Sequence, residues 1–167
     1  MSLFASELLR EIQQTLDAYR AKGWRIITAE SCTGGLIAAA LTEIPGCSAV
    51  FDRAYVTYCN DAKCEMLNVS PALIEAHGAV SQEVAHAMAE GAIRGKEDQY
   101  VSIAATGVAG PSGGSEQKPV GTVHIASARH GKQTLHKQLF FPGNRTEIRL
   151  ATVKEALALL QTRLEGH

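Results

Sequence analysis

Apolar residues recur along this chain with two periods, one typical of helices and one typical of strands. Between Ser2 and Ala21 they follow helical spacing, and Gly23 ends that pattern. Further apolar or β-prone runs then alternate with helical stretches. The expected strands cover residues 24–28, 50–58, 100–105, 120–128 and 133–141, and the expected helices cover residues 2–21, 36–44, 60–67, 71 onward, 82 to about 94, and 144–163.

The order of these elements predicts the architecture. The nearly continuous apolar run at 100–105 indicates a central strand covered on both faces. The strands at 120–128 and 133–141 flank a short polar turn and predict an antiparallel hairpin. We therefore expect a three-layer α/β fold, with a mixed, mostly parallel sheet, helices on both faces and the hairpin at one side. No repeat or long linker divides the chain, so one domain is expected over residues 1–167.

The composition is that of a folded protein, with 46% hydrophobic and 20% charged residues. A formal net charge of −1 gives no electrostatic case for nonspecific nucleic-acid binding. No apolar run is long enough to span a bilayer, and the stretch from Met1 to Lys22 lacks the features of a signal peptide. We expect a cytoplasmic protein without a membrane partner.

The cysteines and histidines do not predict a metal site. Cys32, Cys47, Cys59 and Cys64 form no CxxC pair, and the six histidines lack ligand spacing. Buried free thiols are the expected state of the cysteines. We therefore expect neither a metal nor an organic cofactor.

The segment AESCTGG joins an expected strand to an expected helix and brings nucleophilic side chains into a turn. Ser31, Cys32 and Thr33 precede Gly34 and Gly35, whose missing side chains let a ligand approach backbone N–H groups at a helix start. The alternative is that Ser31 or Thr33 only caps the helix. Spacing alone does not decide between Ser31 and Cys32 as a nucleophile.

A second glycine-rich segment, from Thr106 to Thr122, follows the expected central strand. Its five glycines and two prolines fit a shaped binding loop at the carboxyl end of that strand. The alternative is a long connection rich in turn residues. Neither glycine segment matches GxGxxG or the P-loop pattern, so the common nucleotide fingerprints are absent.

Lys63 is a candidate general base. With Asn60 as the expected N-cap, Lys63 falls in the first turn of a helix, where the dipole favours the deprotonated amine. Such a lysine can take the proton of Ser31 without histidine or aspartate. Two alternatives stand against this: the Asp61 carboxylate would keep Lys63 protonated, and most lysines are solvated surface residues.

Arg145 and Arg149 lie one helical turn apart at the start of the last helix, which Asn144 and Glu147 are expected to open as a capping box. Two guanidinium groups on one face suit a phosphate. The alternative is an ion pair with Glu147 or a solvated face.

Together these segments resemble one family, the carboxyl-terminal domain of the competence/damage-inducible protein CinA, which also occurs as a stand-alone nicotinamide-nucleotide amidase. The resemblance runs from about Glu7 to the end of the chain. The matching motifs are AESCTGG at 29–35, TYCNDAK at 57–63, GAVS at 78–81, TGVAGPSGG at 106–114, KPVGTV at 118–123 and the Arg145 to Arg149 pair.

The resemblance implies hydrolysis of the carboxamide of nicotinamide mononucleotide to nicotinate mononucleotide and ammonia, a step of pyridine nucleotide salvage. In this picture Ser31 is the nucleophile, Lys63 its base, and Tyr58 relays or orients the proton. Backbone N–H groups of the glycine turns stabilise the oxyanion. The implied substrate-binding residues are Thr33, Gly34, Gly35, Thr106, Gly107, Arg145 and, less strongly, Arg149.

Two positions depart from the family pattern. Cys59 stands where serine is common, and Arg53 stands near positions that are often small. Arg53 puts the substrate preference in doubt. The alternative function is a noncatalytic nucleotide-binding or partner-binding regulatory module linked to competence or DNA damage. The apolar face of the first helix suits an interface between copies as well as a core, so a homo-oligomer stays open.

Overall fold

A five-stranded mixed sheet divides the described part of the chain, residues 2–166, into two helical layers in this computed structural model. The strand order is β2-β1-β3-β4-β5. The strands are β1 (Arg25–Glu30), β2 (Phe51–Val56), β3 (Tyr100–Gly107), β4 (Thr122–Ser127) and β5 (Leu135–Phe140). The helices are α1 (Ser6–Ala21), α2 (Leu36–Thr42), α3 (Asn60–Leu67), α4 (Pro71–His77), α5 (Gln82–Ala92) and α6 (Arg145–Leu164), with a 3-10 turn at Cys47–Ala49.

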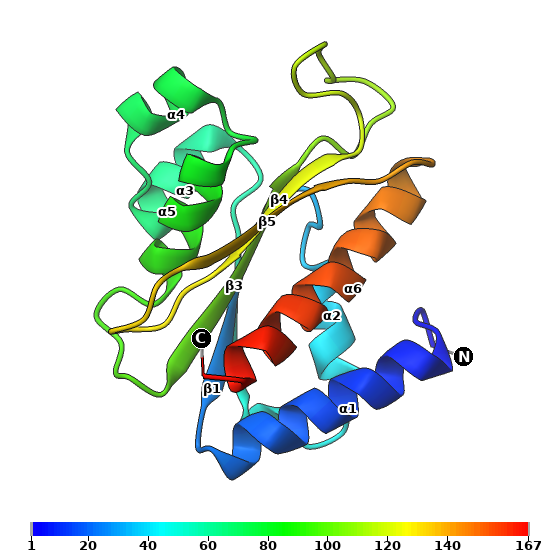
Figure 1. Ribbon diagram of the computed structural model, residues 1–167, viewed down its shortest axis with the longest axis vertical. Coiled ribbons are helices and arrows are strands. Elements are labelled where there is room, and N and C mark those ends of the chain that lie inside the picture. Colours follow the sequence, from blue (N-terminus) through cyan, green and yellow to red (C-terminus); the bar gives the residue numbers. More distant parts are fainter. Residues whose placement is uncertain (1, 167) are drawn as a thin grey trace.

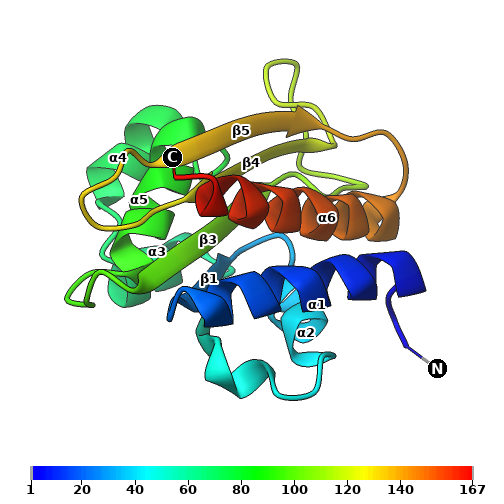
Figure 2. The same cartoon turned by 60° about the horizontal axis from the view of Figure 1, so that its bottom comes forward.

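The pairing confirms the expected fold class. Strand β1 pairs in parallel with β2 and β3, whereas β4 runs antiparallel to both β3 and β5. Helices α1, α2 and α6 cover one face of the sheet, and α3, α4 and α5 cover the other (Figures 1 and 2). Alternate residues of a strand therefore pack into two separate apolar cores. Ile26 of β1 lies in the core with α1, α2 and α6, and Ile27 lies in the core with α3, α4 and α5.

Most expected boundaries hold within a few residues, and the differences have local causes. Helix α1 begins at Ser6 instead of Ser2. Strand β1 continues past Thr28 because Glu30 still pairs with Val56 of β2 and Ala105 of β3. Asn144 forms the expected capping box with Glu147 at the start of α6.

The expected N-cap of α3 was wrong by one residue. Cys59 occupies that position, and its Sγ accepts the N–H of Ala62 at 3.4 Å, while Asn60 is the first helical residue. A thiol is a weaker acceptor than a hydroxyl, but it occupies the same place. Cys59 therefore caps α3 with its thiol in place of the expected Asn60.

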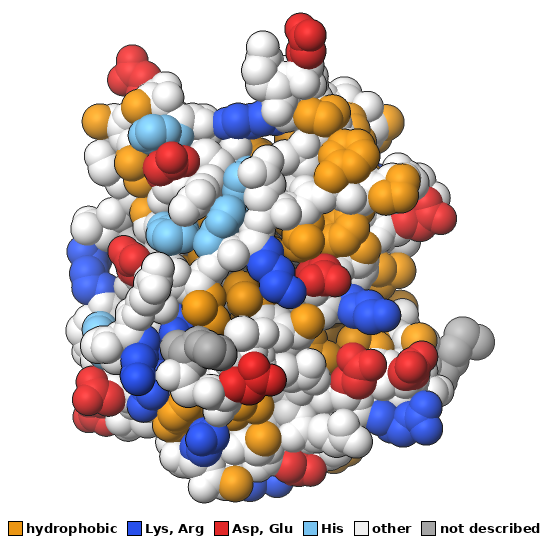
Figure 3. All heavy atoms as spheres, viewed as in Figure 1, with side chains coloured by type: hydrophobic (Ala, Val, Ile, Leu, Met, Phe, Trp, Pro, Cys, Tyr) orange, Lys and Arg blue, Asp and Glu red, His pale blue; other side chains and the backbone are white. Residues whose placement is uncertain are grey.

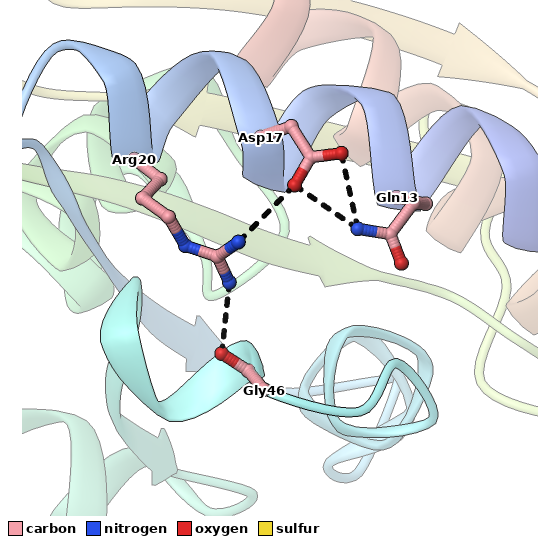
Figure 4. Close-up of polar contacts among 4 residues, drawn as sticks. All are labelled: Gln13, Asp17, Arg20 and Gly46. Atoms are coloured by element: carbon pink, nitrogen blue, oxygen red, sulfur yellow. Dashed lines mark hydrogen bonds and ion pairs between the residues drawn. The ribbon is translucent and has the colours of Figure 1, made fainter.

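The carboxyl end of α1 is fastened to the connection between α2 and β2 (Figure 4). The Arg20 guanidinium donates to the carbonyl of Gly46 at 3.0 Å and to the Asp17 carboxylate at 3.3 Å. Gln13 also donates to Asp17, at 3.1 Å. These exposed contacts hold the carboxyl end of α1 beside the segment that follows α2 in the same layer.

Candidate functional site

The segment from Ser31 to Gly35, here called the glycine turn, lies at the carboxyl ends of β1 and β3. Strand β1 ends at Glu30, and the N–H of Ser31 still donates to the carbonyl of Ala105 at 3.0 Å. Both Gly34 and Gly35 have positive φ, at 58° and 96°, a conformation in which other residues are strained. The sequence therefore turns sharply from strand to helix and leaves Ser31 at the end of the sheet.

Ser31 and Lys63 are in direct contact. The Lys63 Nζ lies 3.0 Å from Ser31 Oγ, and it also donates to the carbonyls of Thr57 at 3.0 Å and Tyr58 at 3.3 Å. Ser31 is 8% exposed and Lys63 only 1%. The expected pairing is therefore present, and the interpretation of Lys63 as a solvated surface lysine does not hold.

The surroundings of Lys63 favour its neutral form. Burial lowers the pKa of the Lys63 amine, because desolvation disfavours its charged form. Within residues 2–166 no ion pair joins Lys63 to a carboxylate, and Asp61, the residue expected to oppose deprotonation, is exposed. An amine of this kind can accept the proton of a neighbouring hydroxyl.

Cys32 is a poor competitor for the role of nucleophile. Burial raises the pKa of its thiol to about 11, so that the thiolate, which is the reactive form, is scarce near neutral pH. No hydrogen bond joins its Sγ to a base in the described residues. The geometry therefore favours Ser31.

Ser31 and Lys63 open onto a cleft of about 280 Å³. Its walls also include Asn60 at the start of α3, Ala79 and Val80 before α5, and the segment from Thr106 to Gly113. The connection between β3 and β4 rises above the end of the sheet in Figure 1. The second glycine segment therefore forms a wall of this cleft.

Thr106 and Gly107 lie at the base of this wall. The Thr106 hydroxyl is 1% exposed and donates to the carbonyl of Ala79 at 2.8 Å. A Cβ at Gly107 would lie 2.7 Å from Val123 Cγ2 and 3.2 Å from Cys32 Sγ. Glycine is therefore required there for the close approach of the glycine turn to β4.

Arg145 also lines the cleft. Its guanidinium donates to the carbonyl of Gly110 at 2.7 Å and to the hydroxyl of Tyr58 at 2.7 Å. Tyr58, 59% exposed, thus meets Lys63 only through its backbone carbonyl, and its hydroxyl faces Arg145. The expected relay of a proton by Tyr58 has no contact to support it, whereas Arg145 is placed to meet an anion.

Four other predicted residues do not line the cleft. Thr33 is fully buried, and its hydroxyl has no partner among the described residues. The N–H of Gly34 donates to the carbonyl of Ser31 at 3.0 Å, and the N–H of Gly35 donates to the Glu30 carboxylate at 3.1 Å. Arg149 donates to the carbonyls of Cys32 and Thr33, at 3.2 and 3.0 Å.

Two functional features were missed from the sequence. The first is Glu30, whose carboxylate caps α2. Its position as the only charged residue of AESCTGG was a signal in the sequence that could have indicated this role. Second, within residues 2–166, no carbonyl or carboxylate oxygen accepts the N–H groups of Cys32 and Thr33, which follow Ser31. Of the two residues, Cys32 lines the cleft beside Ser31, whereas Thr33 is fully buried, so the N–H of Cys32 is better placed to serve an oxyanion than the two glycine N–H groups.

Histidines gather where α5 meets β5 (Figure 3). His124 Nδ1 lies 2.9 Å from His136 Nε2, and the ring of His86 packs edge-on against His136. Within the described residues, no group of three His, Cys, Asp or Glu side chains could hold a metal ion.

None of the helices in residues 2–166 combines the length and the apolar character that a membrane span requires.

A protein-family model described as the CinA C-terminal domain matches residues 9–164. A CinA-like protein of Syntrophobacter fumaroxidans is 50% identical over 141 residues, which cover 84% of this chain and 33% of that protein. A CinA-like protein of Mycobacterium tuberculosis is 50% identical over 144 residues, again with 33% of its length covered. The chain therefore spans about a third of the length of these relatives.

Two further proteins match over nearly their whole length. The nicotinamide-nucleotide amidohydrolase PncC of Enterobacter agglomerans is 48% identical over 147 residues, which cover 88% of this chain and 87% of that protein. The crystal structure of the competence/damage inducible protein CihA from Agrobacterium tumefaciens superposes with a TM-score of 0.92 at 47% identity and covers 99% of both chains.

Proposed function

This chain belongs to the CinA C-terminal domain family, and from that premise we propose that it is a nicotinamide-nucleotide amidase. It hydrolyses the carboxamide of nicotinamide mononucleotide and releases nicotinate mononucleotide and ammonia. The contact that supports this most directly is the 3.0 Å between Lys63 Nζ and Ser31 Oγ at the wall of a cleft. The choice of substrate is supported by the similar protein named nicotinamide-nucleotide amidohydrolase, which this chain matches over 87% of its length.

Ser31 attacks the carboxamide carbon, and neutral Lys63 takes the proton of its hydroxyl. The three partners of Lys63 suit this role, because a neutral amine has two N–H groups and one lone pair. The carbonyls of Thr57 and Tyr58 accept the two N–H groups, and the lone pair is left to face Ser31 Oγ.

The tetrahedral intermediate carries a negative oxygen, which the N–H of Cys32, the residue that follows Ser31 and lines the cleft, stabilises. The N–H that follows a nucleophile is a frequent oxyanion donor. Lys63, now an ammonium, then protonates the leaving nitrogen, which departs as ammonia and leaves an ester on Ser31. Water hydrolyses this ester with Lys63 again as the base, which restores the enzyme and releases the carboxylate.

Arg145, which lines the cleft, binds the phosphate of the substrate. Its guanidinium is exposed and keeps donor capacity beyond its contacts with Gly110 and Tyr58. A planar guanidinium binds a phosphate through paired hydrogen bonds. This phosphate contact would then favour a mononucleotide over free nicotinamide.

The test is ammonia release from nicotinamide mononucleotide, free nicotinamide and the dinucleotide, compared between the wild-type protein and Ser31→Ala. We expect turnover of the mononucleotide that Ser31→Ala abolishes. Binding of the mononucleotide by calorimetry with no ammonia release would instead support the noncatalytic module. Equal turnover of free nicotinamide would contradict the phosphate assignment.

A further inference from the structure

Two charged side chains, Glu30 and Arg149, form hydrogen bonds with the backbone of the glycine turn but do not line the cleft. Glu30 is fully buried at the end of β1, and its carboxylate accepts three backbone N–H groups at the start of α2. The donors are Gly35 at 3.1 Å, Ile37 at 3.0 Å and Ala38 at 2.9 Å. A buried carboxylate is costly unless it is hydrogen-bonded, so these contacts bind Glu30 and the turn to each other.

Arg149 holds the same turn by its carbonyls. Its Nε donates to the carbonyl of Cys32 at 3.2 Å and its Nη2 to that of Thr33 at 3.0 Å. The guanidinium also lies close to Gly34, since a Cβ built there would be 3.5 Å from Nη2. Arg149 is thus engaged with backbone carbonyls, whereas Arg145, one helical turn earlier, faces the cleft.

The planarity of the peptide bond lets Arg149 fix the orientation of the glycine turn. In a trans peptide the C=O and N–H groups point in opposite directions. The carbonyl of Cys32 and the N–H of Thr33 share one peptide plane. Because Arg149 holds this carbonyl, it fixes the peptide plane that follows Cys32. Cys32 lines the cleft beside Ser31, whereas Thr33 is fully buried.

We propose that Glu30 and Arg149 are positioning residues that clamp the glycine turn from its N–H side and its carbonyl side. They hold the turn so that the N–H of Cys32, which lines the cleft beside Ser31, meets the oxyanion, and Arg149 is no phosphate ligand. This inference rests on the proposed amidase function. It assigns the two arginines of one helix face to different tasks, Arg145 to substrate binding and Arg149 to the rate of the chemical step.

The test compares Arg149→Ala with the matched variant Arg145→Ala on nicotinamide mononucleotide. Loss of an oxyanion donor lowers kcat by about 10²-fold or more. We expect Arg149→Ala to show a loss of this order with little change in KM, and Arg145→Ala to raise KM. Free guanidinium at low millimolar concentration should restore part of the kcat of Arg149→Ala. A raised KM with unchanged kcat in Arg149→Ala would overturn the proposal.

Two further variants guard against loss of folding. Arg149→Lys keeps the charge, but a single ammonium does not reproduce the forked donation to two carbonyls. Glu30→Gln keeps the shape but loses one acceptor oxygen. Both should lower kcat while circular dichroism shows a folded protein, and wild-type kcat in either folded variant would contradict the clamp.

A second readout separates this inference from the proposed function. A fluorophosphonate probe labels an activated serine and places its phosphoryl oxygen beside the oxyanion donor. We expect slower labelling of Ser31 in Arg149→Ala than in Arg145→Ala, even if the mononucleotide is not the substrate. Absence of turnover by the wild-type protein would refute the amidase proposal, and equal labelling rates in the two variants would refute the clamp.

Discussion

The Nζ of Lys63 lies 3.0 Å from the Oγ of Ser31, although 32 positions separate the two residues in the sequence. The amine is only 1% exposed and pairs with no carboxylate of the described residues. Desolvation therefore sets its protonation. A hydroxyl and a deprotonatable amine meet here at the wall of a cleft, which is the arrangement that serine–lysine chemistry needs.

Replacement of Lys63 should separate activity from stability. In Lys63→Met the base is lost, and we expect ammonia release to fall by about 10³-fold. The unfolding midpoint should stay the same or rise, because the substitution removes a buried group that is costly to desolvate and keeps an unbranched side chain. Thermal unfolding and the amidase assay check the two expectations. A lowered unfolding midpoint in Lys63→Met, or ammonia release at the wild-type rate, would contradict them.

The pH dependence of kcat/KM should report the titration of Lys63. Its pKa is lowered by burial, and only the neutral amine accepts the serine proton. Activity should therefore rise as the pH rises through this lowered pKa and should reach a plateau below the ordinary range of lysine. A pH series from mildly acidic to alkaline buffers tests this. An acid limb that persists unchanged in the residual activity of Lys63→Met would assign the titration to another group.

Arg145 should bind the phosphate of nicotinamide mononucleotide. We expect Arg145→Ala to raise KM for nicotinamide mononucleotide by about 10- to 100-fold, the range for a lost hydrogen bond to a charged group. The kcat/KM for nicotinamide riboside, which lacks the phosphate, should change little. Steady-state kinetics on both substrates make the comparison, and an equal loss on both would point to a structural role through Tyr58 and Gly110.

The histidines between α5 and β5 should make the fold sensitive to acid. Burial, followed by the nearby His124 and His86, lowers the pKa of His136 to about 4. An unfolded histidine titrates near 6.5, so the unfolded state binds more protons between roughly pH 6.5 and 4, and stability falls with the pH in that window. Protonation would also turn two N–H groups toward each other across the 2.9 Å contact between His124 and His136.

Thermal unfolding across this pH window checks the prediction. The matched variant is His136→Gln, which keeps a polar side chain but does not titrate. Its midpoint should fall less steeply below pH 6.5 than that of the wild-type protein. Parallel curves for the two proteins would show that other groups control acid stability.

Gly91→Ala should destabilise the fold, against the usual effect of this change inside a helix. A Cβ at Gly91 of α5 would lie 1.9 Å from the carbonyl oxygen of Leu67 at the end of α3. Relief of this clash requires the two helices to separate, at a cost of about 1–3 kcal/mol. Urea denaturation measures the difference, and a gain of the usual ~0.5–1 kcal/mol for glycine to alanine would contradict the close packing.

The sequence by itself determined the elements and their order. Apolar periodicity and turn or capping residues act locally, so the bounds of the helix at 60–67 and the capping box of Asn144 and Glu147 were predicted correctly. The N-cap of the helix at 60–67 is nevertheless Cys59 instead of Asn60. Strand boundaries that depend on pairing were not predicted correctly. Strand β1 extends to Glu30 because the neighbouring strands continue beside it. Local signals carry no information about such neighbours.

Tertiary structure alone decided the chemistry of the charged residues. The helical repeat places Arg145 and Arg149 on one face, but only the packing of α6 sends Arg145 to the cleft and Arg149 to the backbone of the glycine turn. In the same way, the sequence gives no measure of how far Lys63 is removed from water. Charge, contact and pKa depend on what the whole fold brings within a few ångströms, and that is set by residues far away in the chain.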